Sequence, residues 1–224
     1  SPDGKRSINL PLESYGRNRW IVTPGWQFPE DASEGVWNIA VTFSNESGIA
    51  GKITTPLVYG NAMWWDSNAR RIFPDGPSRY GKTAADIAAA RNEWEAFQVA
   101  VTSARGLKGV VLRPTDLTHA NREAKIDASE ITVELEEHSY LFANAIFRSG
   151  LSPAPLLPWR EVDIPAGTQR VAWITVRVPK GIPAGLYTGA IHAESHGGWS
   201  SELPLKLHVF DFSLPDVLSF TPLI

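Results

Sequence analysis

Short runs of β-branched and aromatic residues, separated by Pro, Gly, Asn and Ser, recur along most of this 224-residue chain. They recur every 8 to 15 residues or so, with no regular helical segment between them. The clearest runs are 19–23, 36–44, 52–60, 93–103, 110–114, 130–142, 170–179, 185–195 and 203–215. This rhythm predicts an all-β protein with little helix, folded as an antiparallel β-sandwich of the immunoglobulin or jelly-roll kind.

Residues 80–93 are the one stretch that could form a helix. A Thr83 cap precedes an alanine-rich segment, as at many helix starts. However, the same segment runs directly into the strong strand pattern of 94–103, so a strand or a short turn is the alternative. The sequence leaves both open.

Charge and cysteine content restrict the partners and the chemistry of the chain. Its net charge is -3, with 21 basic and 24 acidic residues spread along it, so we expect no nucleic-acid partner. The absence of cysteine excludes disulfides and thiolate metal sites from the sequence. No apolar run approaches the roughly 20 residues that span a bilayer. We expect a mature or trimmed bacterial protein that is secreted, periplasmic or on the cell surface.

Glu93 and Glu95 flank Trp94 in a strand pattern, which would place their carboxylates on one face about 7 Å apart. Paired carboxylates about 5 to 9 Å apart are typical of glycosidases. The alternative is that the two side chains lie at a sheet edge, or that one pairs with Arg91. Pairs of this spacing are common and mostly solvated, which favours a structural role.

Other catalytic or cofactor chemistry has no motif in the chain. Of its five histidines, His192 and His196 are the closest in sequence, but they lie on a strand that runs into a turn. That geometry does not hold two ligands together as a helix would, so we expect no metal site. Gly-x-Ser-x-Gly, Gly-x-Gly-x-x-Gly and the Walker pattern are all absent, and we expect no cofactor.

Nine tryptophans are many for a chain of this length, and flat indole rings both fill β cores and stack on sugars. Three belong to strand patterns and are expected in the interior or at a domain contact: Trp37, Trp94 and Trp173. The candidates for carbohydrate binding are Trp64, Trp65, Trp159 and Trp199. Since Trp64 and Trp65 are adjacent, they should point to opposite faces of a strand.

Three stretches together resemble a known family: "AARNEWEAFQVAV" at 89–101, "QRVAWITVRVPKGIPAGLYTGAI" at 169–191 and "LPLKLHVFDFSLPD" at 203–216. They are similar to the N-terminal β-sandwich of glycoside hydrolase family 123 and of relatives with a DUF4091-type catalytic domain. The segment "GLSPAPLLPW" at 150–159 resembles that group's Gly-x-x-Pro-Asp-Pro-Leu-Leu-Pro, with Ala154 in place of the aspartate. The resemblance runs from about residue 64 to 216.

The resemblance implies a role beside a catalytic domain. Family members are retaining β-N-acetylgalactosaminidases, in which an Asp-Glu pair on a (β/α)8 barrel assists the substrate's own 2-acetamido group. A barrel needs about 200 residues, so it would follow this chain, and no catalytic residue is carried over. Glu93 and Glu95 would then be scaffolding. The partners expected are this barrel and an oligosaccharide.

The resemblance also suggests a division of the chain. We expect a polar linker or edge strand at 1–18, additional strands at 19–62, the accessory sandwich at 63–216 and the start of a linker at 217–224. The leading hypothesis is a noncatalytic accessory domain of a glycoside hydrolase acting on N-acetylhexosamine-containing glycans. The alternatives are a carbohydrate-binding module, or a structural or adhesive sandwich that inserts a terminal segment into a neighbour.

Overall fold

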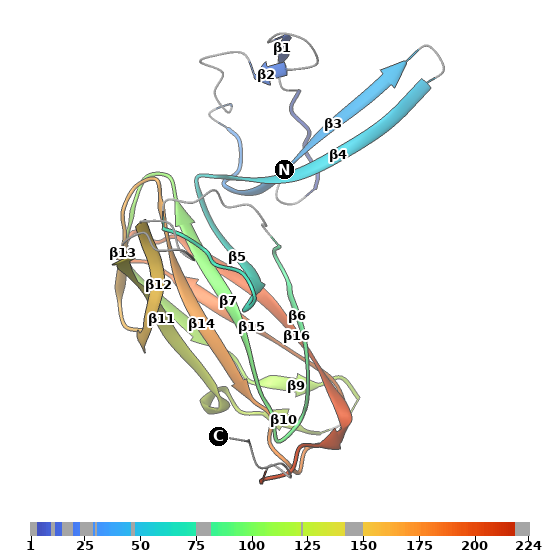
Figure 1. Cartoon of the computed structure of the whole chain (residues 1–224), viewed down its shortest axis with the longest axis vertical. Coiled ribbons are helices and arrows are strands. Elements are labelled where there is room, and N and C mark those ends of the chain that lie inside the picture. The colour runs from blue at the N-terminus through green and yellow to red at the C-terminus, as the bar shows by residue number, and fades with distance from the viewer. Residues whose placement is uncertain are drawn as a thin grey trace.

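A computed structural model gives the structure of residues 4–9, 12–14, 20–22, 29, 31–45, 48–74, 82–121, 123–141 and 150–217 (Figure 1). Within these ranges, one three-residue 3-10 helix, η1 (Ala128–Glu130), stands among sixteen strands. No helix in the described ranges is long and apolar enough to cross a membrane. The strands are β1 (Leu12–Ser14), β2 (Trp20–Val22), β3 (Gly35–Asn45), β4 (Gly48–Tyr59), β5 (Asn61–Ser67), β6 (Ala85–Arg91), β7 (Trp94–Ser103), β8 (Leu107–Pro114), β9 (Leu117–His119), β10 (Lys125–Ile126), β11 (Ile131–Leu141), β12 (Gly150–Pro158), β13 (Val162–Ile164), β14 (Thr168–Arg177), β15 (Gly185–Glu194) and β16 (Ser200–Ser213).

Two sheets form the body of the protein. One has five strands in the order β12-β11-β14-β7-β5, all antiparallel. The other has seven strands, with β10-β9-β15-β16-β6 in order and β8 and β13 joined through β15. Only β6 lies parallel to its neighbour, β16, among the pairings of the described strands. The prediction of an all-β sandwich with little helix is confirmed.

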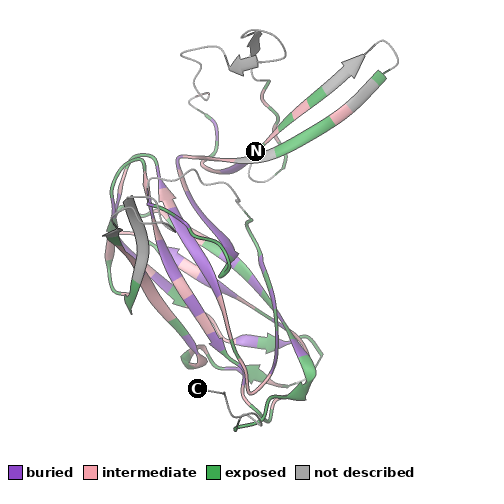
Figure 2. Ribbon diagram, in the orientation of Figure 1, coloured by how far each residue is buried: buried purple, intermediate pink, exposed green. Residues whose placement is uncertain are grey.

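The hydrophobic core lies between the two sheets (Figure 2). Alternate residues of β7, namely Phe97, Val99 and Val101, point into it and are fully buried. From the opposite sheet, β16 contributes Leu203, Leu205 and Leu207. This period of two is the pattern expected of strands with one face on a core, and it removes large apolar side chains from water.

The ambiguous segment 80–93 contains a strand. Ala85, Ile87 and Ala89 of β6 are buried in the core, while Asp86 between them is exposed. The strand alternative was therefore correct and the helix was wrong, although residues 80 and 81 lie outside the described ranges. A two-residue turn then takes the chain from one sheet to the other. Its first residue, Asn92, has a φ of 63°, a left-handed conformation that Asn tolerates better than most residues.

A second layer covers the part of the outer face of the five-stranded sheet that carries Trp64, Ala100 and Val171. It is the segment 68–74, which we call the strap. Side chains of three strands bond to its backbone or to the residue before it: Gln98 to the carbonyls of Ser67 and Arg70, Gln169 to that of Phe73, and His138 to that of Ile72. Beneath the strap, Ile72 packs with Trp64, Ala100 and Val171 in a separate apolar cluster.

The N-terminal strands form two small sheets of their own. β1 pairs with β2, and β3 with β4 in a long hairpin that projects from the sandwich (Figure 1). Glu34, at the base of this hairpin, accepts hydrogen bonds from the main chain and side chain of Asn61. The division at 18, 62 and 216 stays a prediction. The terminal segment 218–224, proposed to insert into a neighbour, lies outside the described residues, as does half of 1–18.

Candidate functional site

The glutamate pair does not share a strand face. β7 begins at Trp94, so Glu93 belongs to the turn, where its Oε2 accepts a hydrogen bond from the Ala90 amide at 2.5 Å. Glu95 is half-buried at the start of β7. Burial raises the pKa of Glu95, and the neighbouring charge of Glu93 raises it further. Arg91 pairs with Asp211 rather than with either glutamate.

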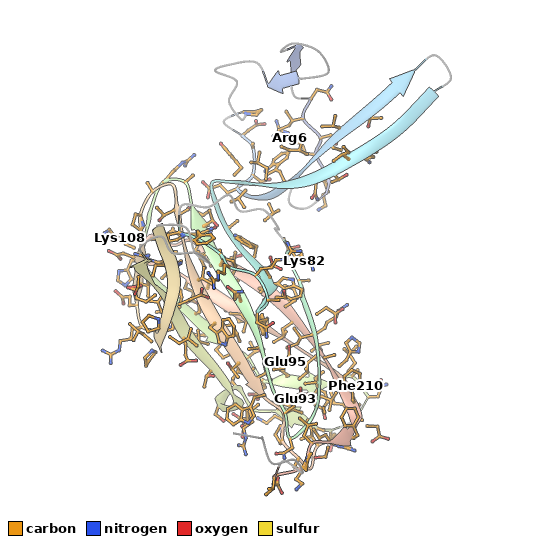
Figure 3. All side chains as sticks on the ribbon, in the orientation of Figure 1. Arg6, Lys82, Glu93, Glu95, Lys108 and Phe210 are labelled. Atoms are coloured by element: carbon orange, nitrogen blue, oxygen red, sulfur yellow. The ribbon has the colours of Figure 1, made fainter. Side chains whose placement is uncertain are left out.

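These contacts make Glu93 a cap of the β6–β7 turn. Its side chain is held by backbone, and its own carbonyl accepts from the Val178 amide. Figure 3 shows both glutamates in the half of the sandwich that lies away from the β3–β4 hairpin. Placing both carboxylates on one strand face was wrong, because the chain changes sheets at Asn92 and Glu93 and the alternation starts only after them.

Glu136 is an acidic residue that the sequence reasoning passed over. It lies on β11 and is 4% exposed, and its Oε2 has no hydrogen-bond partner among the described residues. Burial raises the pKa of Glu136 to about 7, since the charged form loses its water. The only signal in the sequence was an acidic cluster in a strand, and most such side chains are solvated.

Two of the four tryptophans proposed for sugar binding are buried. Trp64 is 1% exposed and donates its indole N–H to Thr102 Oγ1 at 2.9 Å. Trp65 is 6% exposed and lies edge-on to Phe97. The two side chains do point to opposite faces of β5, and each joins a different apolar cluster. Neither ring offers a face to solvent, so their carbohydrate-binding role stays a prediction that this burial disfavours.

The other two candidates, Trp159 and Trp199, are half-buried and pack against the main core. Trp159 donates its indole N–H to the carbonyl of Val110. Trp199 closes the turn between β15 and β16, where its carbonyl accepts from the Ser195 amide. Their sugar-binding role likewise stays a prediction.

Trp94 was expected in the interior or at a domain contact, and the interior is wrong, since Trp94 is 63% exposed. It lies on the outer face of the five-stranded sheet, below the part that the strap covers. Beside it is a shallow groove of about 500 Å³, which crosses from β7 to β12. The groove is lined by Trp94, Thr132, Val133, Glu134, Pro158 and Thr175.

The outer face of the other sheet carries an apolar patch at the C-terminal end of β16. The patch comprises Phe210, Phe212, Leu214 and Val217, which are 48%, 54%, 37% and 78% exposed. The two phenyl rings stack with their centroids 5.8 Å apart. Asn92 donates hydrogen bonds to the Leu214 carbonyl and the Asp216 carboxylate, which fixes the chain beside the β6–β7 turn. The patch therefore lies where the chain leaves the sandwich.

The histidines are dispersed. Three of them each lie beside a different carboxylate: His192 with Glu202, His196 with Glu161 and His208 with Asp86. His119 is buried, and its ring stands edge-on to Tyr187. In the described part of the chain, no group of three or more His, Asp or Glu is placed to hold a metal ion.

Comparisons with known proteins agree with the fold. Residues 76–195 match the model of a family described as the glycoside hydrolase 123 N-terminal domain. A solved family 123 glycoside hydrolase from Clostridium perfringens, studied for glycolipid glycan hydrolysis, matches with a TM-score of 0.61 and 14% identity. The match covers 69% of this chain and 28% of that one, and at this identity it shows the fold alone.

A second solved structure is much less similar. It is MyfA, the major subunit of Myf fimbriae from Yersinia enterocolitica, in complex with galactose, with a TM-score of 0.35 and 12% identity over 67% of this chain and 98% of that one. This likeness is too weak to support an argument. No curated protein matches the chain.

Proposed function

Because the chain belongs to the family of glycoside hydrolase 123 N-terminal domains, we propose that it is a noncatalytic β-sandwich accessory domain of a glycoside hydrolase. The substrate class in this proposal is N-acetylhexosamine-containing glycans. The partner is a catalytic (β/α)8 barrel that follows in the parent protein, in keeping with the 28% of the family 123 structure that this chain covers. Residues 63–216 would form the accessory unit, and 217–224 would begin the linker.

The apolar patch of Phe210, Phe212, Leu214 and Val217 carries this proposal. It is exposed, aromatic and adjacent to the point where the chain leaves β16. An apolar surface of this kind is costly to leave in water and marks interaction sites. A domain attached directly after the patch is held at a high local concentration, so even a weak contact is populated. We therefore assign the patch to the contact with the barrel.

A hydrolysis assay tests the noncatalytic part of the proposal. The 224-residue chain should not release aryl alcohol from an aryl N-acetylgalactosaminide, because the Glu93 carboxylate is engaged as a turn cap and leaves Glu95 without a second free carboxylate beside it. Turnover by the chain that disappears in Glu95→Gln would refute the proposal.

A proteolysis experiment tests the contact. In the full-length parent protein, Phe210→Ser combined with Phe212→Ser should loosen the sandwich from the barrel and speed cleavage within 217–224. Lys206→Ser is the matched control, since Lys206 is exposed on the same face of β16 and outside the patch. Equal cleavage rates in both variants would contradict this assignment of the patch.

Export from a bacterial cell is also part of the proposal. Glycolipid glycans, the substrate studied with the Clostridium perfringens enzyme, face the outside of cells, and a related protein would meet them there. Detection of the protein in the culture medium or the periplasmic fraction would support export, and its confinement to the cytosol would refute it.

A further inference from the structure

We propose that the groove beside Trp94 is a binding site for a hexopyranose oligosaccharide. This inference is independent of the proposed function, since it concerns the outer face of the five-stranded sheet and not the patch at Phe210. The site also differs from the four tryptophans that the sequence suggested. It uses Trp94, the tryptophan found among the exposed large hydrophobic residues of the described ranges.

The groove residues run diagonally across the sheet, shifting by two residues along the strands from each of the following pairs to the next. Trp94 of β7 faces Arg177 of β14, Thr175 faces Thr132 of β11, and Glu134 faces Pro158 of β12. Four adjacent strands are crossed, and three spacings of about 4.8 Å make an extent of roughly 14 Å perpendicular to the strands. The groove is therefore longer than one pyranose ring and suits an oligosaccharide. Its volume of about 500 Å³ lies within the usual range for ligand sites.

Trp94 supplies the stacking surface. The guanidinium carbon of Arg177 lies 5.6 Å from the centroid of the Trp94 ring, a cation–π contact that fixes the orientation of the indole. Arg177 is itself held by Glu130 at 3.1 Å. An aromatic ring held in place loses little conformational entropy when a ligand binds to it. The C–H face of a pyranose is the complementary surface.

The rest of the groove supplies hydrogen-bonding groups. In the described part of the chain, no hydrogen bond or ion pair occupies the Glu134 carboxylate or the Thr175 hydroxyl, and the Thr132 hydroxyl makes only a long contact of 3.5 Å to the Thr175 carbonyl. A carboxylate accepts from sugar hydroxyls, while threonine hydroxyls both donate and accept. This donor and acceptor set fits the ring of hydroxyls around a sugar.

Other ligand classes fit the groove less well. A phosphate or nucleic acid would meet the Glu134 carboxylate, and Arg177 is already paired with Glu130. The centre of a protein interface is depleted of charge and apolar, whereas this floor carries a glutamate and two threonines. An oligosaccharide would stack on the Trp94 ring and form hydrogen bonds with the polar side chains of the groove.

The test is binding of the 224-residue chain to an array of hexopyranose oligosaccharides from di- to hexasaccharides, both N-acetylated and not. We expect binding to at least one series, weakened about tenfold or more by Trp94→Ala. Phe212→Ala is the matched control, because Phe212 is an exposed aromatic on the opposite sheet, and it should bind like the wild type. Thermal melts establish that each variant is folded.

Two further variants keep the test decisive if Trp94→Ala does not fold. Glu134→Gln replaces one acceptor oxygen by an N–H donor and removes the charge, and Thr175→Val removes the hydroxyl, both at nearly constant volume; each should weaken binding of the same oligosaccharide severalfold. Failure of the wild-type chain to bind any sugar on the array overturns the proposal. Binding that Trp94→Ala, or these two variants, leave unchanged overturns it as well.

Discussion

Burial of Glu136 should make the stability of the domain depend on pH. This carboxyl is 4% exposed on β11, and burial raises its pKa from 4.5 to about 7. The folded protein therefore keeps the proton more tightly than the unfolded chain does. Its contribution to stability is intact below pH 4.5 and is lost as the pH rises through 7.

The size of the loss follows from the two pKa values. Each pH unit between 4.5 and about 7 lowers the free energy of unfolding by about 1.4 kcal/mol. At pH 8, the burial of Glu136 should therefore have lowered it by on the order of 3 kcal/mol. Glu95, whose pKa is also raised, contributes in the same direction. Comparison with Glu136→Gln isolates the Glu136 part, because the amide has nearly the same shape and does not ionise.

Urea denaturation at pH 4.5 and pH 8 measures this effect. At each pH, the free energy of unfolding of Glu136→Gln is compared with that of the wild type. The difference, variant minus wild type, should be about 3 kcal/mol larger at pH 8 than at pH 4.5. The additional N–H group of the amide is equally costly at both pH values, so its effect cancels in the difference. If the free-energy difference between the two proteins is the same at both pH values, the assignment of a buried, proton-binding Glu136 is refuted.

Substitutions at three more positions test the packing. Gln98→Leu removes two hydrogen bonds to the backbone at and before the strap, so urea denaturation should show a loss of about 1–3 kcal/mol in the free energy of unfolding; an unchanged free energy of unfolding would argue against the strap contact. Gly189→Ala places a Cβ 2.6 Å from the Asp116 carbonyl oxygen, and should lower stability by about 1–3 kcal/mol; an unchanged melting temperature would contradict that close approach. Asn92→Ala should lower the free energy of unfolding by about 2 kcal/mol, because alanine strains the left-handed backbone and loses the hydrogen bond to the Leu214 carbonyl. Asn92→Gly loses the same hydrogen bond without the backbone strain, so its loss should be smaller. Equal losses in the two variants would contradict the backbone contribution.

The sequence predicted the strands better than their surroundings. Alternation in 94–103 correctly assigned Phe97, Val99 and Val101 to one face, because a strand has a period of two whatever covers it. The same rule correctly placed Trp64 and Trp65 on opposite faces. Local patterns, however, do not show what lies above the second face.

That second layer explains the misplaced tryptophans and the missed glutamate. The strap and the base of the β3–β4 hairpin are distant in sequence from Ala100 and Val171, yet Ile72 and Val36 cover these residues. Trp64 is therefore buried on a face that a single strand pattern leaves open, and Glu136 is likewise only 4% exposed. Trp94 lies on the same face beyond the strap, which leaves its ring exposed. Only the tertiary fold distinguishes the covered half of the sheet from the open half.

The most direct test of the accessory-domain account is the mass of the protein from its native source, measured on the intact chain and by peptide mapping. The account predicts peptides that continue beyond Ile224 for about 200 residues or more, enough for a (β/α)8 barrel. A native chain that ends at Ile224 would contradict the account.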